Sequence, residues 1–191
     1  MRDKLIELGE RAKEEPIYPD DRFPPSLYYR FLKLLAQEFK PKLSVELGVC
    51  GGGGSLHLCE AKQGKVVGVD YQWDHSENVE YIKNKHSHFK FVLGDSIEQA
   101  QNIYKTFGKV DLLFVDTDHV YHRTIDEFNA WRPYLSKNAI VCFDDLFRHH
   151  PVHAKGMTEA WNDLPGEKLR LDFLHDGSYP YGGGFGCMWG F

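Results

Sequence analysis

The sequence predicts an α/β fold built on a doubly wound sheet of seven strands, mostly parallel, with one antiparallel strand at an edge. From Lys42 onward, short apolar runs alternate with longer amphipathic stretches, which is typical of repeated βα units and a parallel sheet. Near the end of the chain, two further apolar runs are joined by the turn-rich segment GSYPYGGG, which favours an antiparallel pair at one sheet edge. We therefore expect helices on both faces of one central sheet.

The chain is expected to divide into an N-terminal helix with a proline-rich arm, residues 1–24, and one larger domain, residues 25–191. Its 191 residues are too few for two full domains. The arm contains the segment EEPIYPDDRFPP, whose four prolines prevent regular structure. After it, apolar side chains recur at helical spacing from Leu27 to Phe39, and Ser26 provides a start signal, so a helix is predicted there.

Strands are predicted at the short apolar runs of the larger domain, and helices in the amphipathic stretches between them. The expected strands are 43–47, 66–69, 89–93, 111–115 and 139–143, and the expected helices are 55–62, 76–85, 96–106 and 121–132. Pro133 ends the last of these helices. Beyond Asp145 the pattern predicts a helix near 154–163, a strand at 169–174 and a final apolar run, FGCMWGF.

Composition excludes several classes of function. The net charge of -5 argues against broad binding to nucleic acid or to anionic lipid. No apolar run approaches the roughly 20 residues that span a bilayer, and the amino terminus lacks the apolar stretch of a signal peptide, so a cytoplasmic protein is expected. The four cysteines form no C-x-x-C pair, which indicates neither a structural zinc site nor a disulfide framework.

The strongest local signal is LSVELGVCGGGGSLHLCEA, a strand followed by a glycine-crowded turn and a helix. Such a turn lets a ligand approach the backbone, and the start of the helix presents unpaired N–H groups. A dinucleotide fingerprint fails because Leu56 stands where its third glycine is needed, and a phosphate-binding P-loop fails because no lysine precedes Ser55. Glu46, two residues before Gly48, favours an ammonium group over a pyrophosphate.

Polar residues also follow the next two strands. Asp70 ends the second strand about 20 residues after the glycines, where an acid can accept both hydroxyls of a ribose. Asp95 and Ser96 end the third strand, where they either meet an adenine amino group or cap the following helix. Partners for an ammonium group, a ribose and an adenine together describe S-adenosylmethionine better than a nicotinamide cofactor.

Five segments, VELGVCGGGGS, VVGVD, FVLGDS, VDLLFVDTDHVY and AIVCFDD, in this order, resemble the class I S-adenosylmethionine-dependent methyltransferases. More narrowly, DTDHVY, the helix with DEFNAWRPYL, and VCFDD resemble the metal-dependent small-molecule O-methyltransferases, which include catechol-type, macrolide-sugar and cephalosporin-pathway enzymes. The resemblance covers residues 25–191 and implies a Rossmann-like fold and methyl transfer to a small-molecule hydroxyl. The chain departs from the family by one extra glycine in the turn between Glu46 and Ser55.

The resemblance also implies residue roles. The methionine part of the cofactor is expected to lie against Glu46, Gly48, Gly52, Gly53 and Ser55. The ribose is expected at Asp70 and the adenine at Asp95 and Ser96, and Asp116 is expected to contact the cofactor as well.

A second group of acids predicts a metal site. Asp116 ends the fourth strand and Asp144 and Asp145 end the fifth, and neighbouring parallel strands bring such carboxylates to one edge of a sheet. Oxygen ligands without cysteine favour Mg²⁺, or Mn²⁺, over zinc. The alternative is that these acids are helix caps or solvated loop residues. A run with His149, His150 and His153 follows, for which substrate contact is favoured over metal ligation.

His119, three residues after Asp116, is expected to be the catalytic base that removes the hydroxyl proton. Its alternative is a surface loop histidine without a role. The expected partner is a small-molecule hydroxyl acceptor of unidentified structure, and the aromatic tail from Tyr179 to Phe191 suggests a homo-oligomer. Two other functions stay open: a metal-independent methyltransferase of the same fold, and a non-catalytic S-adenosylmethionine-binding scaffold.

Overall fold

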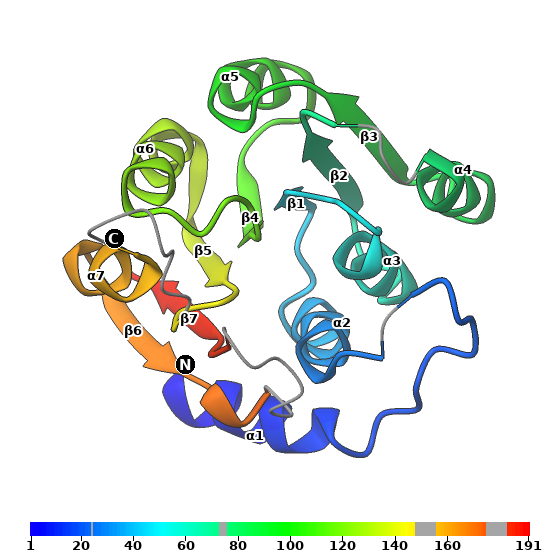
Figure 1. Cartoon of the computed structure of the whole chain (residues 1–191), viewed down its shortest axis with the longest axis horizontal. Coiled ribbons are helices and arrows are strands. Elements are labelled where there is room, and N and C mark those ends of the chain that lie inside the picture. Colours follow the sequence, from blue (N-terminus) through cyan, green and yellow to red (C-terminus); the bar gives the residue numbers. More distant parts are fainter. Residues whose placement is uncertain (24, 73–75, 148–155, 175–182) are drawn as a thin grey trace.

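A sheet of seven strands organises the computed structural model, which describes residues 1–23, 25–72, 76–147, 156–174 and 183–191. The strands are β1 (Leu43–Leu47), β2 (Lys65–Asp70), β3 (Phe89–Leu93), β4 (Val110–Val115), β5 (Leu135–Phe143), β6 (Glu167–Arg170) and β7 (Gly186–Trp189). Their order is β3-β2-β1-β4-β5-β7-β6 (Figure 1). The first five strands are parallel, and β7 runs antiparallel to both β5 and β6. The predicted mostly parallel sheet with antiparallel pairing at one edge is confirmed.

Helices cover both faces of this sheet, as expected for a doubly wound fold. They are α1 (Arg2–Ala12), α2 (Leu27–Phe39), α3 (Gly53–Glu60), α4 (Ser76–Lys85), α5 (Ser96–Phe107), α6 (Tyr121–Trp131) and α7 (Met157–Asp163), with short 3-10 turns η1 (Arg132–Tyr134) and η2 (Asp172–Leu174). Helices α1 to α4 share one hydrophobic cluster with the sheet, and α5 to α7 share a second on the opposite face (Figure 1). None of the helices in the described part of the chain is long and apolar enough to cross a membrane.

The sequence of the central strand β1 does not alternate between apolar and polar residues, and its burial explains why. All five residues of β1 are buried, because helices cover both of its faces. Val45 and Leu47 pack into the cluster of α5 to α7. The side chain of Glu46 lies on the other face, where it meets Ser55 of α3.

Three predicted boundaries were wrong for identifiable reasons. The strand expected at 169–174 ends at Arg170, because η2 lets Leu171 and Leu174, three residues apart, enter the same hydrophobic cluster. The helix expected at 55–62 begins two residues earlier, at Gly53, since the last two glycines of the turn are helical. Strand β5 begins at Leu135, four residues before its predicted start, and reaches the regular register with β4 through a bulge. Residues 154 and 155 of the helix expected at 154–163 lie outside the described ranges.

The N-terminal arm lies against α4, and α1 packs on the main domain. The hydroxyl groups of Tyr18 and Tyr81 are 3.0 Å apart, and the guanidinium carbon of Arg22 lies 3.9 Å from the centre of the Tyr81 ring. Leu5 and Leu8 of α1 belong to the same hydrophobic cluster as α2 and α3. The expected division at residue 24 stays a prediction, since the two parts share one core.

The described part of the aromatic tail packs within the chain. Phe185 is fully buried and lies 5.8 Å from Tyr28 in a stacked arrangement, and the ring of Phe191 contacts Phe128 edge-on at 5.5 Å. Tyr179 and Tyr181 lie outside the described residues. A homo-oligomer formed through this tail stays a prediction.

Candidate functional site

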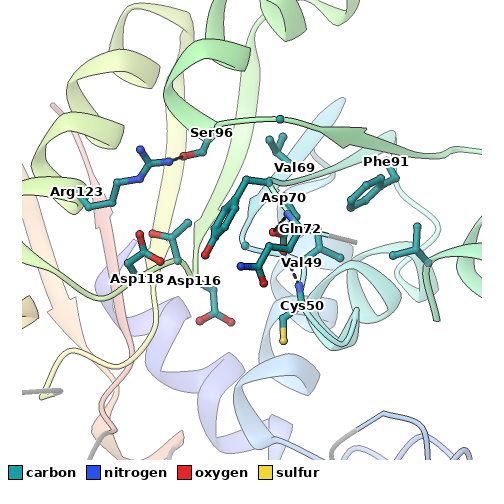
Figure 2. Close-up of a pocket in the computed structure, with 15 residues that line it drawn as sticks. Val49, Cys50, Val69, Asp70, Gln72, Phe91, Ser96, Asp116, Asp118 and Arg123 are labelled. Carbon is teal, nitrogen blue, oxygen red and sulfur yellow. Dashed lines mark hydrogen bonds between the residues drawn. The ribbon is translucent and has the colours of Figure 1, made fainter. Parts of the chain in front are cut away.

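A cavity of about 220 Å³ opens at the carboxyl ends of β1, β2 and β4 (Figure 2). Its walls are residues 48–50, 69–72 and 116–118, together with Val79, Phe91, Gly94, Ser96 and Arg123. Ligands of open α/β sheets bind at this edge, because the strand order reverses there and the loops diverge. The cavity is therefore the candidate functional site.

The turn after β1 approaches the neighbouring strand so closely that only glycine fits at Gly48. Its φ is +84°, and an added Cβ would lie 2.0 Å from the backbone oxygen of Asp116. The N–H of Gly48 donates to the oxygen of Val69 at 2.9 Å, and the N–H of Asp116 donates to the oxygen of Leu47 at 2.9 Å. These contacts hold the ends of β1, β2 and β4 together at the floor of the cavity.

Asp70 fixes the other side of the same turn. One oxygen of its carboxylate accepts the backbone N–H of Cys50 at 2.9 Å, and the other accepts the N–H of Gln72 at 3.0 Å (Figure 2). A carboxylate has about four acceptor positions, so these two bonds leave capacity for ligand hydroxyls on the side of the cavity. The structure thus places Gly48 and Asp70 at the cavity, as the sequence predicts.

Glu46 lies behind the turn and not among the residues that line the cavity. Its side chain accepts a hydrogen bond from the Ser55 hydroxyl and is 1% exposed. Burial raises the pKa of Glu46 to about 8, although the Ser55 hydrogen bond opposes the shift. Gly52 and Gly53 face Ile82 and the ring of Tyr29 respectively. Cofactor contact by Glu46, Gly52, Gly53 and Ser55 stays a prediction.

Asp95 caps the helix after the third strand, which is the role that the sequence left open beside contact with the adenine. Its side chain accepts the backbone N–H groups of Ile97 at 2.9 Å and Glu98 at 3.2 Å, and it forms an ion pair of 2.8 Å with Arg123. Burial acts to raise the pKa of Asp95, but these partners outweigh it and hold that pKa below its ordinary value. The neighbouring residue, Ser96, lines the cavity. Contact of Asp95 and Ser96 with the adenine stays a prediction.

Arg123 is a charged residue of the cavity wall that the sequence analysis did not identify. Its guanidinium donates to the Ser96 hydroxyl at 2.6 Å (Figure 2). It also donates to the Glu127 carboxylate at 3.1 Å. The spacing of Arg123 and Glu127, four residues apart on one helix, is the pattern that could have drawn attention to it. Its link to Ser96 spans 27 residues and has no sequence signal.

Beside Asp116, which lines the cavity, the loop after β4 brings His119 close to two of the predicted acids. The Nε2 atom of His119 lies 3.5 Å from Asp116 and 3.7 Å from Asp145. His119 is only 8% exposed, so the alternative of a surface loop histidine is wrong. Asp144 is 4% exposed, and its charge, with that of Asp116, adds to burial in raising the pKa of Tyr28. Tyr28 therefore lies near the acidic group as well.

The acids of this group do not form a recognisable metal centre. Within the described ranges, no three His, Cys, Asp or Glu side chains are grouped so as to hold a metal ion. The segment with His149, His150 and His153 lies outside those ranges. A cation at Asp116, Asp144 and Asp145 stays a prediction.

Sequence comparison relates the chain to methyltransferases. Residues 45–146 match a family model described as "Methyltransferase domain". An uncharacterized protein of Acanthamoeba polyphaga mimivirus is 28% identical over 177 residues, which cover 81% of this chain and 76% of that protein. An uncharacterized protein of Sinorhizobium fredii is 26% identical over 215 residues; the match covers this whole chain but only 23% of that longer protein.

Solved structures share the fold at low sequence identity. An O-methyltransferase from Bacillus cereus, in complex with S-adenosylhomocysteine, has a TM-score of 0.72 and 16% identity, with 98% of this chain and 90% of that chain covered. The O-methyltransferase TomG from Streptomyces achromogenes, involved in tomaymycin synthesis and solved with S-adenosylmethionine, has a TM-score of 0.67 and 15% identity, covering 100% and 91%. A methyltransferase from Podospora anserina, bound to S-adenosylhomocysteine, has a TM-score of 0.64 and 18% identity, covering 100% and 89%.

Proposed function

Because this chain belongs to the methyltransferase-domain family, we propose that it transfers a methyl group from S-adenosylmethionine to a hydroxyl group of a small molecule. The observation that carries the proposal is the position of Asp70. Its carboxylate is bonded to the glycine turn and also lines the cavity at the carboxyl ends of the strands. Relatives of the same fold bind this cofactor or its product, as described above.

The residues of the cavity fit the cofactor by their chemistry. Asp70 would hold the ribose hydroxyls, while Ser96 and the apolar side chains of Val79 and Phe91 would hold the adenine. Gly48 lines the cavity and has no side chain, so the backbone of the turn would be accessible to the ligand. When bound, S-adenosylmethionine supplies an electrophilic methyl group.

His119 is the proposed base for the acceptor hydroxyl. The imidazole removes the hydroxyl proton as the acceptor oxygen attacks, and the two nearby carboxylates stabilise the resulting positive charge. Holding both reactants in one site accounts for much of the rate, because effective molarities of oriented groups correspond to about 7 kcal/mol or more of the barrier. Asp116 lines the cavity and contacts His119, so it joins the cofactor side to the acceptor side.

Assistance by Mg²⁺ or Mn²⁺ is proposed from donor chemistry alone. Asp116, Asp144 and Asp145 supply the oxygen ligands that these ions prefer. The fit is incomplete, because the His119 imidazole lies between Asp116 and Asp145 and no three-ligand group is present among the described residues. No step is therefore routed through a metal, and the same contacts favour metal-independent methyl transfer as the second candidate.

A small-molecule acceptor is proposed over nucleic acid on the basis of the net charge of -5. The first test measures binding of S-adenosylhomocysteine by calorimetry. The second measures formation of S-adenosylhomocysteine from S-adenosylmethionine in the presence of a panel of catechols and sugars. Saturable binding and turnover of an acceptor support the proposal. Turnover that EDTA leaves unchanged selects the metal-independent reaction. Binding without turnover of any acceptor selects a scaffold, and absence of binding overturns the proposal.

A further inference from the structure

A fully buried carboxylate lies directly behind the cavity wall at the end of the third strand. Glu127 of α6 has no exposed surface and does not line the cavity. It accepts hydrogen bonds from the Ser96 hydroxyl at 2.5 Å, from the Thr117 hydroxyl at 2.8 Å and from Arg123 at 3.1 Å. The mechanism proposed above makes no use of this group.

All three partners of Glu127 line the cavity, and they come from three separate segments. Ser96 begins α5 and Arg123 lies on α6 (Figure 2). Thr117 belongs to the loop after β4. These segments are adjacent only in the folded chain, since Ser96 and Glu127 are 31 residues apart. One carboxylate therefore joins two helices and a loop that form the same wall.

The network also fixes the direction of each polar group. The Ser96 hydroxyl donates its hydrogen to Glu127, and its oxygen accepts a hydrogen bond from Arg123. Arg123 is held between Glu127 and Asp95, at 3.1 and 2.8 Å. A buried carboxylate with one cation and two hydroxyl donors is satisfied as an ion, whereas a neutral amide at this position must leave a donor or the cation without its partner.

We propose that Glu127 is a positioning residue that shapes the third-strand end of the cavity through Ser96, Thr117 and Arg123. This inference rests on the proposed function, in which that end of the cavity holds the adenine. Glu127 orients the groups that bind the purine and keeps the guanidinium of Arg123 against the wall. It takes no part in methyl transfer itself.

The test compares binding of two ligands by titration calorimetry. S-adenosylhomocysteine and adenosine are titrated into the wild-type protein, Glu127→Gln and the control Asp126→Asn, whose acid is exposed on the same helix. Loss of a charge-assisted hydrogen bond corresponds to about a 10-fold or larger effect, so Glu127→Gln should weaken both ligands by a similar factor of this size. Asp126→Asn should stay within about 2-fold, as surface substitutions do. The rate at saturating cofactor should fall by less than about 3-fold in Glu127→Gln, since the chemistry is unchanged.

Several outcomes would overturn the inference. Unchanged affinity of Glu127→Gln for both ligands, even with a lower melting temperature, makes the residue purely structural. Weakened binding of S-adenosylhomocysteine with unchanged binding of adenosine would show that Glu127 affects the homocysteine part of the ligand and not the purine. If Glu127→Gln fails to fold, Ser96→Ala, Thr117→Val and the double variant replace it. Losses of ligand affinity that are additive in the double variant would contradict coupling of the two residues through one carboxylate. A wild-type protein that binds neither ligand overturns the proposed function and this inference together.

Discussion

The carboxylate of Asp70 accepts the backbone N–H of Cys50 at 2.9 Å, which ties the end of β2 to the turn after β1. Cys50 has a positive φ of 42°, a conformation that side-chain-bearing residues adopt rarely. The bond therefore stabilises a strained turn at the point where it borders the cavity. The side chain that stabilises this turn is also the proposed acceptor for the ribose hydroxyls.

Replacement of Asp70 by alanine should weaken binding of S-adenosylhomocysteine by at least about 10-fold, because ribose acceptors and the anchor of the turn are lost together. Titration calorimetry measures this loss. Asp172→Asn is a suitable control, since Asp172 is an acid on the surface that pairs with Arg170. Equal affinity of Asp70→Ala and the wild type would place the ribose elsewhere.

Two glycines of the same turn should differ sharply in their tolerance of alanine. A Cβ at Gly54 would lie 2.1 Å from Glu46 Oε1 and 3.0 Å from Phe114, whereas a Cβ at Gly51 meets nothing within 4 Å. Overpacking of a buried site costs about 1–3 kcal/mol, so Gly54→Ala should lower the free energy of unfolding by roughly this amount. Gly51→Ala should change it by less than about 0.5 kcal/mol. Urea unfolding tests the pair, and the reverse order of stability would contradict the packing described here.

Glu46 should make the stability of the protein depend on pH. Burial raises its pKa to about 8 in the folded state, from an ordinary value of 4.5. Between these values the folded state binds a proton that the unfolded state has lost, so the contribution of Glu46 to stability falls as the pH rises toward 8. Glu46→Gln removes this titration while keeping an acceptor for Ser55.

The measurement is the free energy of unfolding of both proteins from pH 5 to pH 9. The wild type should lose stability relative to Glu46→Gln as the pH rises through this window, and the difference should level off above pH 8. Parallel curves for the two proteins would show that Glu46 stays ionised in the folded state.

His119→Asn should lower the rate of methyl transfer by about 100-fold or more, as expected for loss of a general base. Asparagine suits this position because His119 has a φ of 55°, which asparagine adopts more readily than most residues. Binding of S-adenosylhomocysteine should change by less than about 3-fold, because the residue does not line the described cavity.

His122→Asn is the matched control, since His122 is exposed near the start of α6. Its rate should equal that of the wild type. Retained activity in His119→Asn would remove this residue from the proposed reaction, and a parallel loss of cofactor binding would give it a role in the cavity wall instead.

The order of the elements and the edge of the sheet that carries the site were predictable from the sequence by itself. Alternation of apolar runs with amphipathic stretches identifies βα units, and parallel strands all end at one edge. That rule alone brings Asp70, Ser96 and Asp116 to one cavity, although they are far apart in the chain. The resemblance to methyltransferases rests on the same strand ends.

The tertiary structure decided what each of these side chains does, because that depends on neighbours distant in sequence. The Asp95 carboxylate caps α5 and pairs with Arg123. Glu46 lies behind the turn, where it accepts a hydrogen bond from Ser55. Likewise, His119 is placed between Asp116 and Asp145 by the pairing of β4 with β5. In the sequence, Glu127 shows only its spacing of four residues from Arg123 on one amphipathic helix, and packing against α5 and the loop after β4 adds Ser96 and Thr117 as partners. Patterns of hydrophobicity determine which face is buried, whereas hydrogen-bond partners follow from the packing of whole elements.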